Sequence, residues 1–382
     1  MLTRAARPPI TVAKPRIEKL GEGRWRLSTS VAGRVVSISG EDLLAANADA
    51  WVAMLLLPAA KAGVPLQIDA DLDETLQRNV PRILGVARQY WGFRGTSVGT
   101  SGLVRRAATG GSAMFFTGGV DSFFTLRRRG NEIERLIFVN GFDIGLDDVR
   151  RFAAAREWID GVARLLGIKA AYPTTDLKTH PMFHALRWGL VSHGAALATV
   201  AHAMAPLMSR VFVASTDVNP PWGSTPELDP LWSSGAVEIV NDGSEFNRLS
   251  KVRAIADWEP VHRYLKVCIS NQARDLNCGA CEKCVRTQLA FAAAGALDRL
   301  QTFPSGSLIQ RIDDLPYIPE HRKGWWREVH DAIADRPIRD AIDRCLARRI
   351  PVVDWLQQKT EWLRRSSTGR VVRRLGGRLI TR

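Results

Sequence analysis

The sequence predicts an α/β protein that is organised around a doubly wound parallel sheet. Its 382 residues exceed the size of a single hydrophobic core, so we expect more than one domain. From Ser112 onward, short apolar runs typical of buried strands alternate with longer segments of helical spacing. A glycine pair, Gly118 and Gly119, separates the first apolar run from the first helical segment. This alternation is typical of parallel βαβ units, which bind ligands at the carboxyl ends of their strands.

The first hundred residues are expected to form a separate, small α+β domain (1–100). Residues 24–39 alternate in hydropathy well enough for two antiparallel strands that turn near Ala32 and Gly33. A helix at about 49–62, a strand at 64–68 and a helix at 73–90 are predicted to follow. The stretch 95–111 is rich in Gly, Ser and Thr, so we interpret it as a linker.

Residues 111–298 are expected to form the ligand-binding domain, and residues 299–382 a helical extension with a basic tail. Strands of the domain are predicted at 112–116, 135–140, 168–173 and 210–215, and helices at 120–129, 147–166 and 187–207. The extension has an apolar stripe that we expect to pack against the body of the protein, made by Trp325, Trp326, Val329, Ile333, Ile338 and Ile342. Cys345 lies in the same segment and is interpreted as structural.

The positive charge is concentrated at the two chain ends. The net charge is +14, and residues 363–382 contain seven arginines and no acidic residue, while residues 1–20 contain five basic residues and one acidic residue. These segments could contact nucleic acid, a membrane surface or an acidic partner, but we favour solvated tails. The body of the protein is nearly neutral, which is unfavourable for broad tRNA binding. A small-molecule substrate is the partner that we expect, and a homodimer is compatible with the sequence.

No apolar run is long enough to span a bilayer. The longest runs lie near 51–60 and 194–208, and Pro58, His202 and Pro206 interrupt them. The first twenty residues also lack the apolar core of a secretory signal. We therefore expect no membrane helix and a cytoplasmic location.

Residues 117–122, Thr-Gly-Gly-Val-Asp-Ser, are predicted to bind phosphate. Two glycines let backbone N–H groups approach an anion, and the helix that begins at Val120 adds the positive end of its dipole. The segment is not a Walker loop, because no lysine follows Gly119, and it is not Gly-x-Gly-x-x-Gly. The alternative is an ordinary helix start with an aspartate cap. The candidate binding residues are Phe116, Thr117, Gly118, Gly119, Val120, Asp121 and Ser122.

Two further segments follow predicted strands. Asn140 and Gly141 come after the second strand and are expected beside the bound ligand, although a turn with Asp143 as a local cap is an equal alternative. The loop 215–232 contains four prolines, and loops of this length are often functional. We favour a pocket over a surface loop pinned by its tryptophans. In this pocket Trp222 and Trp232 would form an apolar wall, Thr216, Asp217, Ser224 and Asp229 would offer polar groups, and Trp222, Ser224 and Asp229 are the candidate substrate residues.

Four of the five cysteines are clustered as C-x9-C-x2-C-x2-C, at Cys268, Cys278, Cys281 and Cys284. Four thiolates close a tetrahedral shell around zinc, which leaves no position for a catalytic water. The spacing therefore predicts a structural zinc site, with an iron–sulfur cluster as the alternative and a disulfide as less favoured.

The motifs together resemble a known family. Residues 117–122 resemble the Ser-Gly-Gly-x-Asp-Ser signature of the PP-loop ATP pyrophosphatases, with Thr117 in place of the first serine. The segment 247–255, Asn-Arg-Leu-Ser-Lys-Val-Arg-Ala-Ile, and the segment 277–291 around the cysteines resemble the carboxyl half of the 7-cyano-7-deazaguanine synthases. That family also pairs such a loop with a four-cysteine zinc site. The resemblance covers about residues 112–294.

The resemblance implies a HUP-like nucleotide-binding domain and catalytic roles for Asp121, Ser122 and Lys251. Residues 117–122 would bind the phosphates of ATP, Lys251 would lie near the nucleotide or substrate, and the cysteines would hold zinc. The sequence departs from the family after the second strand, where Asp-Tyr-Gly-Gln is replaced by Asn-Gly-Phe-Asp-Ile, beginning at Asn140. ATP use is therefore better supported than a deazaguanine substrate.

The function expected from the resemblance is that of an ATP-dependent, C–N bond-forming ligase. It would attach AMP to a carboxylate or carbonyl oxygen, release pyrophosphate, and let ammonia or an amine displace AMP. The expected cofactors are ATP, Mg²⁺ and Zn²⁺. The alternatives are a tRNA-modifying PP-loop enzyme and a non-catalytic nucleotide- and zinc-binding interaction module.

Overall fold

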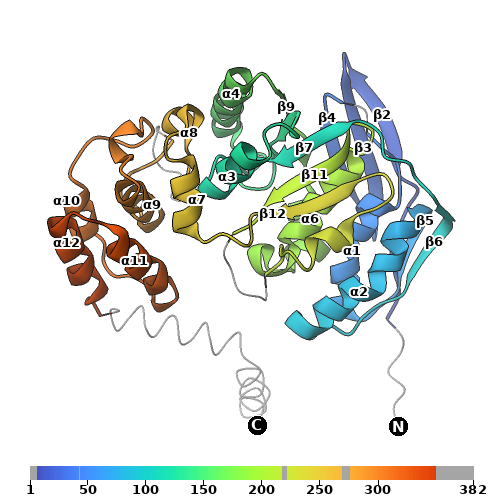
Figure 1. Cartoon of the computed structure of the whole chain (residues 1–382). Coiled ribbons are helices and arrows are strands. Elements are labelled where there is room, and N and C mark those ends of the chain that lie inside the picture. Colours follow the sequence, from blue (N-terminus) through green and yellow to red (C-terminus); the bar gives the residue numbers. More distant parts are fainter. Residues whose placement is uncertain (1–6, 43, 217–221, 269–275, 350–382) are drawn as a thin grey trace, which may run out of the picture. The chain divides into compact units, whose positions relative to one another are not determined.

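The computed structural model of the chain describes residues 7–42, 44–216, 222–268 and 276–349. The chain divides into two compact units (Figure 1). Unit 1 comprises Met1–Lys266 with Leu300–Thr302, and unit 2 comprises Val267–Arg299 with Phe303–Arg382. The basic tail from residue 350 onward and the first six residues lie outside the described residues.

The two units differ from the domains expected from the sequence. The first hundred residues share unit 1 with the parallel sheet, and the cysteine segment groups with the helices that follow it. The physical reason is long-range packing. Strand β10 (Thr174–Thr175) pairs with β4 (Arg34–Gly40), and helix α1 (Asp49–Ala62) packs against α6 (His193–Ala203). Both contacts join the expected small domain to the expected ligand-binding domain.

Sheet A, the sheet of the N-terminal part, is mixed. Its strands run in the order β10-β4-β3-β1-β5-β6, and β2 pairs with β3. The remaining members are β1 (Ile10–Val12), β2 (Arg16–Gly21), β3 (Arg24–Val31), β5 (Leu66–Asp73) and β6 (Val98–Val104). The predicted hairpin is confirmed, since β3 and β4 pair antiparallel and turn at Ala32 and Gly33, which both have positive φ.

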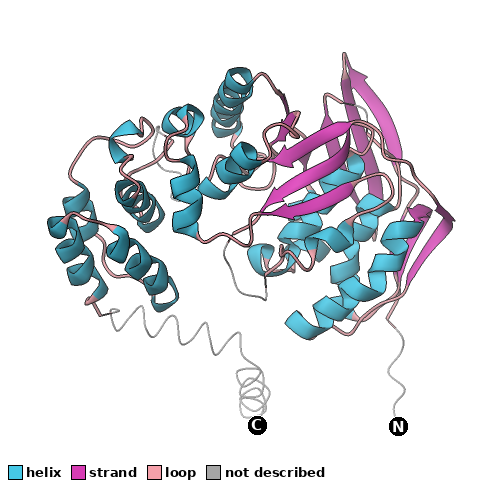
Figure 2. Cartoon of the chain, viewed as in Figure 1, coloured by secondary structure: helices cyan, strands magenta, loops and turns pink. Residues whose placement is uncertain are grey.

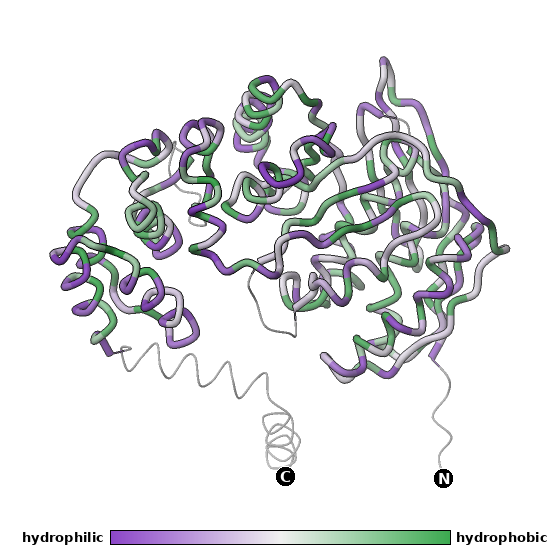
Figure 3. The backbone as a smooth tube through the Cα atoms, viewed as in Figure 1, coloured by the Kyte–Doolittle hydropathy of each residue, from purple (hydrophilic) through white to green (hydrophobic). Residues whose placement is uncertain are grey.

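Helix α1 is the centre of the core of unit 1. Twelve of its residues, on all sides of the helix, are buried. This is expected because the helix is apolar all round and is enclosed by other elements. Its apolar character can be followed along the tube in Figure 3. Helix α2 (Glu74–Trp91) is amphipathic and buries one face, which includes Leu76, Val80 and Ile83. Both helices confirm the sequence prediction.

Sheet B is parallel and has the strand order β12-β11-β7-β8-β9 (Figure 2). Its strands are β7 (Gly111–Phe115), β8 (Arg135–Ile137), β9 (Lys169–Ala171), β11 (Met208–Ala214) and β12 (Glu238–Asp242). From β7 the chain first proceeds outward through β8 and β9, and then returns to add β11 and β12 on the other side. The strand order therefore reverses at β7, where open parallel sheets form a crevice at their carboxyl ends.

The helices between these strands confirm the predicted βαβ alternation. They are α3 (Val120–Arg128), α4 (Val149–Leu166) and α6. One prediction was wrong, and another is confirmed with a local difference. The stretch 95–111 is not only a linker, because β6 forms there and pairs parallel with β5. The helix predicted at 187–207 begins with a π-helical turn, Trp188–Ser192, before α6.

In its described residues, unit 2 contains the cysteine cluster and four α-helices. These are α9 (Glu282–Ala293), α10 (Leu308–Asp313), α11 (Glu320–Ala332) and α12 (Arg336–Leu346). The predicted apolar stripe is buried in this unit at Trp326, Val329, Ile333 and Ile342. Cys345 is also fully buried. Among the described residues, no helix combines the length and the apolar character that crossing a membrane requires.

Candidate functional site

The glycine loop lies between β7 and α3, at the strand where the order of sheet B reverses. Gly118 has a φ of +72°, and a Cβ atom there would collide with the indole of Trp158 on α4. Its carbonyl accepts a hydrogen bond from the Lys266 N–H at 2.9 Å. Only glycine combines this backbone conformation with so close a neighbour, so Gly118 fixes the shape of the turn.

Gly119 has different surroundings. Its φ of −73° and ψ of 169° are accessible to any residue, and a Cβ atom there would meet nothing within 4 Å. Gly119 is the N-cap of α3, and no side chain caps this helix end. The open side of the loop therefore combines free space with the positive end of a helix dipole.

The two hydroxyl groups of the motif lie close together, although Thr117 is an exposed residue. Thr117 Oγ1 and Ser122 Oγ are 3.3 Å apart, and the Thr117 N–H donates to Ser122 Oγ at 3.4 Å. Ser122 is buried. Its hydroxyl thus holds the turn closed, which gives the last residue of the motif a structural role.

Asp121 binds two cations from α7 (Arg248–Ile255). Its Oδ1 is 3.0 Å from Lys251 Nζ, and its Oδ2 is 2.6 Å from the Arg248 guanidinium. Lys251 also donates to the Ser215 carbonyl at 2.6 Å, and its side chain is only 1% exposed. The sequence prediction included Asp121 and Lys251, and the structure brings them into direct contact.

The electrostatics of Asp121 follow from these bonds. Burial alone would raise the pKa of the Asp121 carboxyl, but the charges and hydrogen bonds of Arg248 and Lys251 outweigh burial and lower it. Asp121 is therefore ionised, and the local charge of the three side chains is +1. Such a site suits an anionic ligand.

Arg248 was missed by sequence reasoning. It is three residues before Lys251, so the two side chains project from the same face of one helix. This three-residue spacing is the feature of the sequence from which Arg248 could have been predicted. The side chain of Arg248 is 15% exposed.

Asn140 and Gly141 lie at the end of β8 and are held by β10. The Asn140 N–H donates to the Pro173 carbonyl, and the Asn140 carbonyl accepts from the Thr175 N–H. Gly141 has a φ of +101°, and a Cβ atom there would collide with the Thr175 carbonyl. Asn140 Nδ2 is 3.4 Å from Thr174 Oγ1, while Oδ1 is buried without a hydrogen bond to a described residue. The cap of α4 is Asp148 rather than Asp143.

The three candidate substrate residues lie in a loop that packs against the start of α6. Asp229 is 1% exposed, and its Oδ2 accepts hydrogen bonds from Ser224 Oγ at 2.6 Å and Asn241 Nδ2 at 2.8 Å. Burial raises the pKa of Asp229 to about 6, although both hydrogen bonds oppose the shift. Trp222 lies beside Gly189. These contacts show Asp229 and Ser224 organising the loop.

One member of the predicted pocket, Trp232, differs from expectation, and another is not tested. Trp232 is fully buried in the core of unit 1 and therefore does not form a wall exposed to ligand. Asp217 lies outside the described residues. Trp232 fits better the alternative considered from the sequence, in which tryptophans hold a surface loop in place.

The four cysteines of the cluster converge in unit 2. The sulfur atoms of Cys268, Cys278, Cys281 and Cys284 all lie within 4.8 Å of one another, and Cys278 Sγ is 3.9 Å from Cys284 Sγ. Tetrahedral zinc with Zn–S bonds of about 2.3 Å requires sulfur atoms about 3.8 Å apart. The cluster therefore fits a metal ion such as zinc. The hydrogen bond with Cys281 and burial raise the pKa of the Cys284 thiol, as expected for crowded thiols without a cation.

Glu282 links the cysteine cluster to the helices of unit 2. It directly follows Cys281 and begins α9. Its carboxylate is 2.5 Å from Arg322 and 3.0 Å from Trp326 Nε1, both on α11, and 3.0 Å from Arg286. The side chain of Gln288 donates to the Gly279 carbonyl within the cysteine loop at 3.0 Å.

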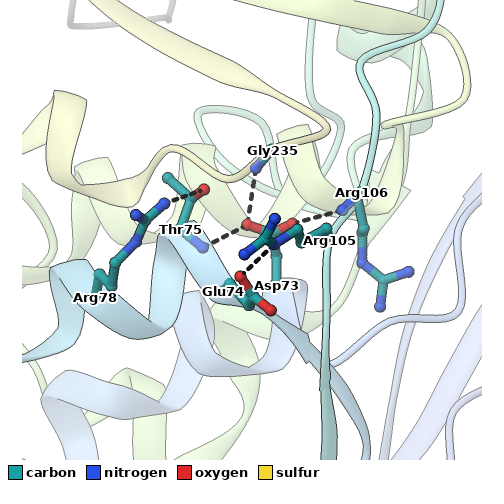
Figure 4. Close-up of a pocket in the computed structure, with 7 residues that line it drawn as sticks. All are labelled: Asp73, Glu74, Thr75, Arg78, Arg105, Arg106 and Gly235. Atoms are coloured by element: carbon teal, nitrogen blue, oxygen red, sulfur yellow. Dashed lines mark hydrogen bonds and ion pairs between the residues drawn. The ribbon is translucent and has the colours of Figure 1, made fainter.

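A cavity of about 380 Å³ lies in unit 1 at the carboxyl ends of β5 and β6, away from the glycine loop (Figure 4). Asp73 caps α2, and its carboxylate accepts hydrogen bonds from the N–H groups of Thr75, Arg106 and Gly235 at 2.8–3.0 Å. Arg105 binds Glu74 at 2.7 Å. The acids of this cavity are thus already paired, and Asp73 has a structural role.

Comparison with known proteins adds no identification. No protein-family model, curated protein or solved structure matches the chain.

Proposed function

We propose that the protein is an ATP-dependent enzyme that transfers AMP to a carboxylate or carbonyl oxygen of a small molecule and lets ammonia or an amine displace the AMP. The observation that carries this proposal is the pairing of an open, uncapped glycine loop with Arg248 and Lys251, which Asp121 holds. The resemblance of residues 117–122 and of the cysteine segment to PP-loop ATP pyrophosphatases supports it.

The loop and the two cations have complementary tasks in this proposal. Backbone N–H groups at the start of α3 bind the pyrophosphate end of ATP, because no side chain of the described residues caps this helix end. Arg248 and Lys251 supply the positive charge that a Walker loop takes from its own lysine. The pyrophosphate then departs as a stabilised leaving group when the substrate oxygen attacks the α phosphorus.

Asp121 does not fit the role of a Mg²⁺ ligand. Both of its carboxylate oxygens are bonded to cations, at 2.6 and 3.0 Å. We therefore assign Asp121 the task of holding Arg248 and Lys251 in place. No step of the proposed reaction requires a metal ion on this side chain.

The cysteine cluster fits zinc, and its four sulfurs would complete the shell. A zinc ion held in this way supplies a structural cross-link and no chemistry, because no open position remains. Cys345, the remaining cysteine, is fully buried, and the residues outside the described ranges contain no cysteine, so there is no accessible sulfur carrier outside the cluster. This disfavours the tRNA-thiolating alternative.

The proposal is tested by resolving nucleotide products after incubation with ATP and a panel of carboxylates, deazapurines and amines. The expected products are AMP and pyrophosphate. Production of ADP and phosphate would overturn the proposal. Turnover of ATP also separates the enzyme from a non-catalytic nucleotide-binding module.

A matched pair of variants tests the site itself. Gly119→Ala places a methyl group in the open space before the loop, where the proposal places phosphate, so ATP affinity should fall at least about 10-fold. Gly85→Ala, in α2, also adds a methyl group to open space and should bind ATP like the wild type. Equal ATP affinities of the two variants and the wild type would show that the loop is not the phosphate site.

A further inference from the structure

His193 lines a small cavity beside the glycine loop. It is the first residue of α6 and directly follows the π-helical turn Trp188–Ser192. Such turns are frequent at functional sites. The cavity lies at the carboxyl ends of β7 and β8, and its lining includes Phe116, Thr117, Phe138, Phe142, Asp143 and His193. One residue of the phosphate loop, Thr117, and one imidazole therefore share the same space.

The size of this cavity limits what can enter it. Its volume is about 30 Å³. This exceeds the roughly 10–15 Å³ that a single water-sized group needs. Ammonia or the amino group of a larger molecule therefore fits, while the body of a substrate must remain outside. Apolar walls from Phe116, Phe138 and Phe142 disfavour a charged ammonium in this space.

The ring of His193 differs from those of the structural histidines in unit 1. His202 is fully buried and its Nε2 lies 2.8 Å from the Trp232 carbonyl, and His180 is buried with Nε2 3.4 Å from the Val31 carbonyl. His193 packs against the Trp188 ring at 5.4 Å, but its nitrogens make no hydrogen bond to any described residue. They are therefore available to a ligand.

The charged groups that face His193 are Asp143 and Lys178. Burial lowers the pKa of His193, the charge of Asp143 opposes this shift, and the charge of Lys178 adds to it. Lys178 donates to the Phe142 carbonyl at 2.5 Å and lies 4.4 Å from the centre of the Trp188 ring. The imidazole is consequently neutral at pH 7 and able to accept a proton.

We propose that His193 is the base that removes a proton from the nitrogen nucleophile. This inference rests on the proposed function. The nitrogen lone pair forms the C–N bond, and the C–O bond to AMP breaks with its electron pair passing to AMP. The surplus proton on nitrogen passes to a ring nitrogen of His193 and then to solvent. Formation of the adenylate does not require this base.

The first test follows the seven histidines of the chain by ¹⁵N NMR as a function of pH, with His193→Gln identifying the signal of His193. α,β-methylene-ATP with Mg²⁺ is the probe. We expect the pKa of His193 to lie below 6.5 without the probe and to rise when the probe brings phosphate near the ring. His180, His202 and His262, which bind backbone carbonyls, serve as internal controls and should not respond.

A second variant keeps the test independent of any effect of His193→Gln on folding. Asp143 is exposed, so Asp143→Asn should fold normally. Because the charge of Asp143 raises the pKa of His193, this variant should lower that pKa. An unchanged pKa would contradict the arrangement on which the proposal depends.

The kinetic test separates the two half-reactions with a substrate found by pyrophosphate release. His193→Gln should release pyrophosphate in the first turnover at the wild-type rate but form the amide product about 100-fold or more slowly. Amide formation at the wild-type rate, or probe binding that leaves the His193 signal unmoved, would overturn the assignment of His193 alone. Failure of the wild-type protein to bind the probe would instead overturn the proposed function.

Discussion

At the scale of single residues, the surroundings of Gly118 and Gly119 predict different changes in stability when each glycine is replaced by alanine. Gly118→Ala requires a left-handed backbone and a collision with Trp158, so it should lower the free energy of unfolding by about 2–4 kcal/mol. Gly119→Ala needs no left-handed backbone and causes no collision, so it should change the free energy of unfolding by less than about 0.5 kcal/mol. Urea denaturation of both variants measures the difference. Equal stabilities would show that neither the left-handed backbone at residue 118 nor the contact with Trp158 opposes an added Cβ atom.

Asp229 predicts a measurable pH dependence. Its folded-state pKa of about 6 exceeds the ordinary value of 3.8, so its charged form destabilises the fold and stability falls as pH rises from about 4 to 6. That difference corresponds to at most about 3 kcal/mol at neutral pH. Asp229→Asn should therefore be more stable than the wild type at pH 8 and should narrow the difference in unfolding free energy between pH 4 and pH 8. A variant with the wild-type pH dependence would contradict the assignment.

The same residue shows what the sequence could not reveal. In the loop 215–232 the tryptophans were interpreted as an apolar wall of a pocket, and the polar side chains as groups that face a substrate. Asp229 instead binds Asn241, on β12, a strand that was not predicted. Without that partner, a buried aspartate in a loop cannot be distinguished from one that faces a substrate. Asp121 and Lys251 were found because their motifs are local.

At the scale of elements, α3 and α7 are joined by the ion pairs of Asp121. Asp121→Asn leaves Lys251 buried without a charge partner, which should cost about 3 kcal/mol of unfolding free energy. Adding Lys251→Met removes the stranded charge and should recover more than half of that loss. A double-mutant cycle on unfolding free energies measures the coupling. Additive effects would mean that the two side chains contribute independently.

Strands were predictable where apolar runs mark them. The segments of β7, β8, β9 and β11 were all expected, because buried parallel strands are apolar on both faces. β6 reads Val-Gly-Thr-Ser-Gly-Leu-Val and resembles a linker, since its backbone pairing with β5 and not its side chains makes it a strand. Edge strands of this polarity are therefore visible only in three dimensions.

At the scale of the whole molecule, the sequence predicted three domains and the chain forms two compact units. The parts before and after residue 100 lie in one compact unit, because β10, a two-residue strand from the middle of the chain, extends sheet A. A strand of two residues is too short to be predicted from a local sequence pattern. The cysteine segment was expected within the ligand-binding domain 111–298, and in the structure Glu282 bonds to Arg322 and Trp326 on α11.

This organisation predicts what removal of the metal does. The cysteine cluster and Glu282 are adjacent and both belong to unit 2, so the loss of one zinc ion per chain should loosen α9 and α11 together. Hydrogen exchange after chelation should show lost protection in these helices, with the amides of β7 and β11 still protected. The matched variants are Cys281→Ser, which should lose the zinc, and Cys345→Ser, which changes a buried cysteine outside the cluster and should retain it.

Zinc content measured by mass spectrometry shows whether Cys281→Ser loses the metal and Cys345→Ser retains it. Because Cys281 lies one residue before Glu282, the Cys281→Ser variant should lose the anchoring of Arg322 and Trp326 even at saturating zinc. Protection of α11 that survives both chelation and Cys281→Ser would show that the helices of unit 2 are stable without the metal. In that case the cluster would have another task, and a shell of four sulfurs would have to open to perform it.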